Sequence, residues 1–86
     1  MPQLQGDLKF ANVTALLGHA DALAAGPLDL SNVGAIDSAG VAFLLALCRR
    51  AAAQGRQLPL LNAAPQVRTL LTFYGVDTMF ELETRP

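Results

Sequence analysis

The stretch LDLSNVGAIDSAGVAFLLALCRR, residues 28–50, decides the fold class of this chain. Its first part begins with a short strand, Leu28-Asp29-Leu30, which Val33 and Ile36 continue loosely. After the Asp37-Ser38 step, apolar residues recur at helical spacing over residues 39–54, and Gly55 is a typical residue for ending a helix. A strand that leads directly into a long helix is typical of an α/β fold.

The rest of the chain continues this alternation of strands and helices. Leu8 and Phe10 flank a lysine as a strand end would, and Asn12 is a suitable N-cap for a helix over residues 12–24. We also expect a strand over residues 58–61, a helix over residues 64–74 and a last edge strand over residues 79–82. The sequence therefore predicts a single domain, residues 1–86, with a small mixed sheet of about four strands and three helices.

Composition and charge argue against several functional classes. The net charge is -1 and no basic run is longer than Arg49-Arg50, so nucleic-acid binding is not expected. Cys48 and His19 are the only residues of their types, so we expect no disulfide and no bound metal. No nucleotide-binding glycine motif occurs, and no cofactor is expected. The N-terminus lacks signal-peptide features and the apolar run Val41–Cys48 is too short to span a bilayer, so a cytoplasmic protein without direct membrane insertion is predicted.

Residues 28–45 resemble the central signature of the STAS family, which includes anti-sigma factor antagonists and regulatory domains of sulfate transporters. The signature is an acidic strand, a Val-x-x-Ile-Asp step, Ser or Thr, a small residue, Gly and an apolar helix. Within the family, FLLALCRRAAAQG at residues 43–55 and LLTFYGV at residues 70–76 are similar to the MlaB subgroup. That subgroup is the small STAS subunit of the ABC complex that moves phospholipids between the membranes of Gram-negative bacteria.

The resemblance implies a function in protein binding, with two alternatives. The first is a non-catalytic subunit that binds and supports a transporter ATPase, and so lies at the inner membrane through its partner. The second is an anti-sigma factor antagonist, controlled by a serine kinase that phosphorylates Ser38. Family members usually begin with a strand hairpin, whereas only about ten residues precede the first helix here, so the first strand is expected to be shortened or missing.

Ser38 has two interpretations, which are compatible with each other. Its hydroxyl is placed to cap the long helix, and Ser38→Ala would then cost about 1 kcal/mol. The family resemblance implies instead that Ser38 matches the phosphorylated residue of the antagonists. A phosphate there would lie beside Asp37 and add about two negative charges to a docking surface. Asp29 and Asp37 are otherwise interpreted as turn or loop acids.

The long helix carries two apolar faces. At 100° per residue, the core stripe is expected to comprise Val41, Leu44, Leu45, Cys48 and Ala52. A second strip of small and apolar residues ends in an arginine; it either packs against a neighbouring helix or forms a groove for a partner. With the junction residues, the candidate partner-binding set is Asp37, Ser38, Ala39, Phe43, Ala46, Leu47 and Arg50.

No catalytic arrangement is apparent, so an enzyme is not expected. A nucleophilic serine needs a nearby base, but His19 lies on a different predicted helix, on its solvent side. Cys48 falls on the predicted core stripe, where thiols are usually inert.

Overall fold

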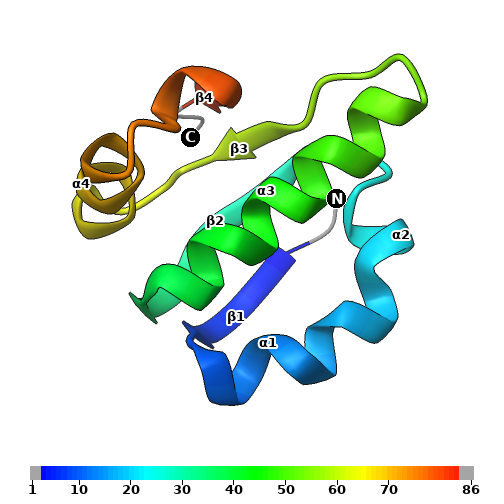
Figure 1. Cartoon of the computed structure of the whole chain (residues 1–86). Coiled ribbons are helices and arrows are strands. Elements are labelled where there is room, and N and C mark those ends of the chain that lie inside the picture. The colour runs from blue at the N-terminus through cyan, green and yellow to red at the C-terminus, as the bar shows by residue number, and fades with distance from the viewer. Residues whose placement is uncertain (1–2, 84–86) are drawn as a thin grey trace.

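The computed structural model describes residues 3–83, which form a four-stranded sheet covered by helices (Figure 1). The strands are β1 (Gln3–Leu8), β2 (Leu28–Ile36), β3 (Pro59–Leu61) and β4 (Glu81–Glu83), and their order in the sheet is β1-β2-β3-β4. The helices are α1 (Phe10–Leu16), α2 (Ala20–Leu23), α3 (Ser38–Ala53) and α4 (Pro65–Phe73), with short 3-10 turns η1 (Leu17–His19) and η2 (Asp77–Met79). This architecture confirms the predicted four-stranded α/β fold.

The sheet differs from the prediction in the direction of its strands, and its first strand is not missing. That strand spans six residues and pairs with β2. The sequence indicated only its end at Leu8, because Gly6, at φ +80, and two register shifts interrupt the alternation, which leaves Leu4 and Leu8 as the only apolar residues of β1. The sheet is parallel at every described pairing, not mixed, because a helical crossover separates each pair of neighbouring strands between residues 3 and 83. Phe10, expected at the end of the strand, starts α1 instead.

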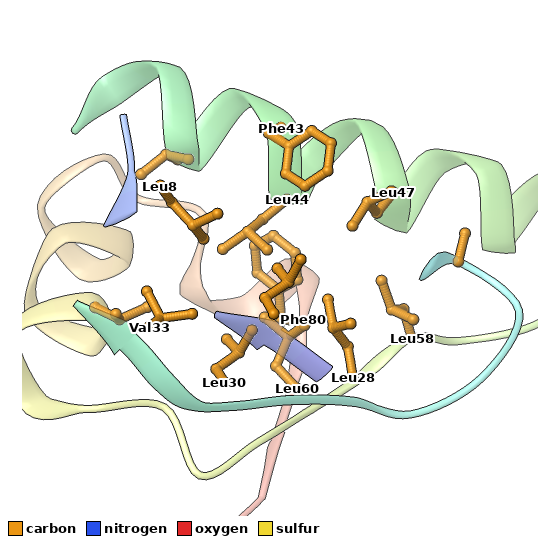
Figure 2. Close-up of a cluster of buried hydrophobic side chains, with 14 of the residues drawn as sticks. Leu8, Leu28, Leu30, Val33, Phe43, Leu44, Leu47, Leu58, Leu60 and Phe80 are labelled. Carbon is orange, nitrogen blue, oxygen red and sulfur yellow. The ribbon is translucent and has the colours of Figure 1, made fainter. Parts of the chain in front are cut away.

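The core lies between the helices and one face of the sheet. Figure 2 shows Leu44 and Leu47 of α3 facing Leu28 and Leu30 of β2, and all four are fully buried. Buried residues of α1, α2 and α4 join the same cluster: Val13, Ala20, Val67 and Leu71. The helices therefore share one core with the sheet, while β2 also carries exposed residues such as Ser31 and Asn32.

The ends of the helices show how the sequence sets their bounds. Gly55 adopts φ +72 after α3, and its N–H and that of Arg56 donate to the carbonyls of Ala52 and Ala51. This is a Schellman motif, as expected for a glycine in that place. Pro65 occupies the first turn of α4, a position that favours proline. Asn12, however, is not a cap, since α1 begins at Phe10 and its N-cap is Lys9.

Candidate functional site

The candidate site is the junction between β2 and α3. Asp37 is the N-cap of α3, with an extended backbone, and its Oδ1 accepts a hydrogen bond of 3.1 Å from the N–H of Gly40. Its Oδ2 accepts a second bond of 3.1 Å from the N–H of Phe10, 27 residues earlier in the chain. One carboxylate therefore joins the start of α3 to the start of α1.

Ser38 is not the cap that the sequence suggested. It is the first residue of α3, and its side chain is exposed. Between residues 3 and 83 no hydrogen bond of its hydroxyl is found, whereas Asp37 makes two. Aspartate and serine are about equally good N-caps, so only the position of the last extended residue could decide between them. The hydroxyl of Ser38 is accordingly available to solvent.

The pKa of Asp37 lies below its usual range. The largest cause is the hydrogen bond from the N–H of Phe10, and the N–H groups of Gly40 and Ala39 and the charge of Lys9 act in the same direction. Partial desolvation opposes them. Because backbone donors stabilise the ionised form, Asp37 is a carboxylate at neutral pH.

Two further contacts fix the end of β2 beside this junction. The N–H of Ala35 donates to Oδ1 of Asp7 at 2.9 Å, and Nε2 of Gln66 donates to the carbonyl of Gly34 at 3.4 Å. A β-carbon built at Gly40 would collide with the carbonyl oxygen of Leu8, so the first turn of α3 lies directly against β1. The junction is therefore held from β1, α1 and α4.

Apolar hollows lie on both sides of α3 next to Ser38. One, of about 250 Å³, is lined by Ser38, Val41, Ala42, Leu45, Tyr74 and Val76. The other, of about 210 Å³, is lined by Val13, Leu17, Ala39, Ala42, Phe43 and Ala46. Ala42 is exposed and belongs to both hollows. We call the residues of the first hollow, with Ala39 and Ala46 of the second, the outer surface of α3.

Of the two interpretations of the second strip of α3, internal packing holds for its two largest members, and the alternative of a partner groove does not. Phe43 is 3% exposed and Leu47 is fully buried, so both belong to the core (Figure 2). Of the predicted core stripe, Val41 and Leu44 are buried, but Leu45 and Cys48 are only half-buried and Ala52 is exposed. The helix is therefore rotated relative to the expected orientation, because the continuous apolar run Val41–Cys48 gives no sharp boundary between faces.

The remaining partner-binding candidates are accessible in varying degree. Ala39 and Ala46 are half-buried at the edge of the second hollow. Arg50 is exposed and forms an ion pair of 2.7 Å with Asp21 of α2. Their part in partner binding stays a prediction. The sequence analysis missed Ala42 and Tyr74, although the spacing of Ser38, Ala42, Leu45 and Arg49 marks the same exposed face of α3.

A family model described as "Mlab, STAS domain" matches residues 3–83. The chain belongs to this STAS family. Among solved structures, the STAS domain is similar to the anti-sigma factor antagonist SpoIIAA in its unphosphorylated form, with a TM-score of 0.65 and 22% identity. That similarity covers 83% of this chain and 70% of that chain. No curated protein sequence is similar enough to count as a match.

Other chemistry finds little support in the described part of this STAS domain. Residues 3–83 contain no group of three His, Cys, Asp or Glu side chains that could hold a metal ion. His19 is exposed, as predicted, and Cys48 donates from Sγ to the carbonyl of Met79 at 3.3 Å. Asp29, interpreted from the sequence as a turn or loop acid, lies instead within β2 and accepts from the N–H of Ser31 at 2.9 Å. No helix described between residues 3 and 83 is long and apolar enough to cross a membrane.

Proposed function

We propose that this STAS domain is a non-catalytic cytoplasmic subunit that binds and supports the ATPase of a phospholipid-transport ABC complex. The observation that carries the proposal is the match of an MlaB-type family model over residues 3–83. The subunit would lie at the inner membrane through its partner. It would need no cofactor, since binding alone explains its activity.

The outer surface of α3 supports this proposal as the place of contact. It combines exposed Ala42 with Tyr74, which is 46% exposed, around a hollow of about 250 Å³. Aromatic side chains such as Tyr74 are enriched in the buried centre of a protein–protein interface. Asp37 and Ser38 form the polar edge of this surface.

Affinity purification from the native host, followed by mass spectrometry, tests the proposal. We expect the wild-type domain to retain an ABC-transporter ATPase and the variant Ala42→Asp to lose it, because a charge would be buried at the interface. Ala53→Asp is the matched control. Ala53 is exposed on nearly the same face of α3, about 16 Å further along the helix, and should leave binding unchanged. Recovery of an anti-sigma serine kinase without any transporter component would contradict the proposal.

A second candidate function is that of an anti-sigma factor antagonist, regulated by a serine kinase. The exposed Ser38, which makes no hydrogen bond among residues 3–83 through its hydroxyl, favours it as a site that a kinase could reach. Mass spectrometry of the protein purified from its host would detect phosphate on Ser38. Its absence under all growth conditions would argue for the transport function.

A further inference from the structure

A further hollow, of about 350 Å³, lies at the end of α3 that is remote from the junction. Its walls come from the last turns of α3, the loop that leads to β3, and η2. Ala52, which lines it, lies about 21 Å along the helix from Ser38. We call it the distal hollow. It is separate from the outer surface of α3, and its volume is within the range of small-molecule sites, which begin at about 300 Å³.

The inner wall of the distal hollow is apolar. Leu58 is 1% exposed and Phe80 is 9% exposed, and both line the hollow while belonging to the core cluster (Figure 2). The thiol of Cys48 also lines it and is bonded to the carbonyl of Met79, so α3 and η2 are joined at this wall. An apolar chain that enters the hollow leaves water for carbon and sulfur atoms, which is favourable.

Arg56 gives the distal hollow a positive charge. It is the one charged side chain among the described residues that line the hollow, and it is half-buried. Its Nη1 donates to the carbonyl of Ala24 at 2.9 Å and its Nη2 donates to Oε1 of Gln54 at 2.6 Å, and both acceptors are neutral. Among the side chains described between residues 3 and 83, no carboxylate pairs with Arg56. The two bonds hold the guanidinium in place, and arginine carries more N–H donors than they use.

The groups around Arg56 do not neutralise this charge. The carbonyls of Ala51 and Ala52 at the end of α3 already accept from the N–H groups of Arg56 and Gly55. No acidic side chain is among the described residues of the lining, and Asp77, which precedes Thr78, is not part of it. Thr78 is exposed at the hollow and adds a hydroxyl donor. A negative group is therefore the complement of this site, because guanidinium and carboxylate form strong charge-assisted hydrogen bonds.

We propose that the distal hollow binds a small amphiphile with a carboxylate head and an apolar chain. The head pairs with Arg56, and the chain lies against Leu58 and Phe80. At roughly 30 Å³ for each water-sized group, the hollow holds about a dozen non-hydrogen atoms. That is the size of a medium-chain carboxylate such as octanoate, whereas a phospholipid with two acyl chains is too large. The site is thus additional to the proposed partner surface and does not depend on it.

A titration of the full chain with sodium octanoate below its micellar concentration, followed by NMR of the backbone amides, tests the proposal. Saturable shifts are expected at Thr78 and Met79, and none at Ala39 and Ala42 at the other end of α3. Octan-1-ol, which has the chain without the charge, should bind at least about tenfold more weakly, the order expected for loss of a hydrogen bond to a charged group. Acetate, which has the charge without the chain, should produce no saturable shift at the same concentrations. Equal affinities for octanoate and octan-1-ol, or octanoate shifts that do not saturate, would overturn the proposal.

Two pairs of variants locate the ligand. Arg56→Gln should weaken octanoate binding at least about tenfold and leave octan-1-ol binding unchanged, whereas Arg56→Lys should retain most of the octanoate affinity. Because Arg56 also bonds to Ala24, a second pair leaves it in place. Ala52→Trp fills the hollow from an exposed position and should abolish binding, whereas Ala53→Trp, at the next exposed position but outside the lining, should not. Octanoate binding that survives in Ala52→Trp would reject the site, whatever partner the domain retains.

Discussion

Replacement of Phe43 distinguishes a core residue from a docking residue. Phe43 is 3% exposed and belongs to the core cluster, so Phe43→Ala removes a buried aromatic ring and should cost about 3 to 5 kcal/mol. At roughly 0.05 to 0.15 kcal/mol per residue, a chain of 86 residues has about 4 to 13 kcal/mol of stability in total. The substitution therefore removes a large part of the stability, and Phe43→Asp, which also buries a charge, should prevent folding.

Thermal unfolding followed by circular dichroism measures the effect. For a domain of this size, about 4 to 8 °C of melting temperature corresponds to 1 kcal/mol, so Phe43→Ala should lower it by about 12 to 40 °C. The matched control is Ala42→Asp at the neighbouring, exposed position. Ala42→Asp should lower the free energy of unfolding by less than about 1 kcal/mol, which is the difference in helix propensity between alanine and aspartate.

The same two variants should also differ in partner binding, in the opposite order to their effects on stability. Ala42→Asp should remain folded and lose the partner, whereas Phe43→Ala should lose stability first. A folded Phe43→Ala protein with a melting temperature close to wild type, but without its partner, would refute the reasoning. Phe43 would then be a contact residue, which is one of the two alternatives that the sequence left open.

Three further outcomes follow from the junction. Gly40→Ala should cost about 1 to 3 kcal/mol in urea unfolding because its β-carbon meets the carbonyl of Leu8, while Gly18→Ala, in open space, should not destabilise. Ser38→Ala should stay within about 0.5 kcal/mol of wild type, since Ser38 is not the cap. Because the pKa of Asp37 is lowered by folding, its contribution to stability is present above pH 4 or so and is lost as pH falls below it. The Asp37→Asn variant should therefore lose less stability than the wild type as the pH falls through that acid range.

The sequence predicted best those elements whose ends are marked by glycine or proline. Gly55 and Pro65 set the bounds of α3 and α4, and each acts through its own backbone geometry, which needs no knowledge of the fold. The first strand carries no such mark. Gly6 interrupts it, and its pairing with β2 establishes its extent, so the local pattern indicated only its end at Leu8.

The orientation of α3 could not be predicted for a different reason. Eight successive residues, Val41–Cys48, are apolar, and a helix of that composition has no sharp boundary between a buried and an exposed face. Gly40 fixes how the first turn lies, because it lets the helix approach Leu8, and the exposed ion pair of Arg50 with Asp21 is compatible with that orientation. Both depend on residues of β1 and α2, which lie far away in sequence.

Asp37 belongs both to the candidate site and to the fold, because its carboxylate caps α1 and α3 together. The residues around each helix start predict a separate cap for each helix, Asn12 and Ser38, because asparagine and serine are favoured N-caps. The structure instead uses one acid for both helices, which leaves Ser38 exposed and ties Phe10 to α3. Because Asp37 secures the start of α1, its loss would affect stability and the shape of the docking surface together. A variant at Asp37 that fails to bind a partner therefore says little by itself, and the uncharged and charged replacements of Ser38, which leave that cap residue in place, are the more informative probes.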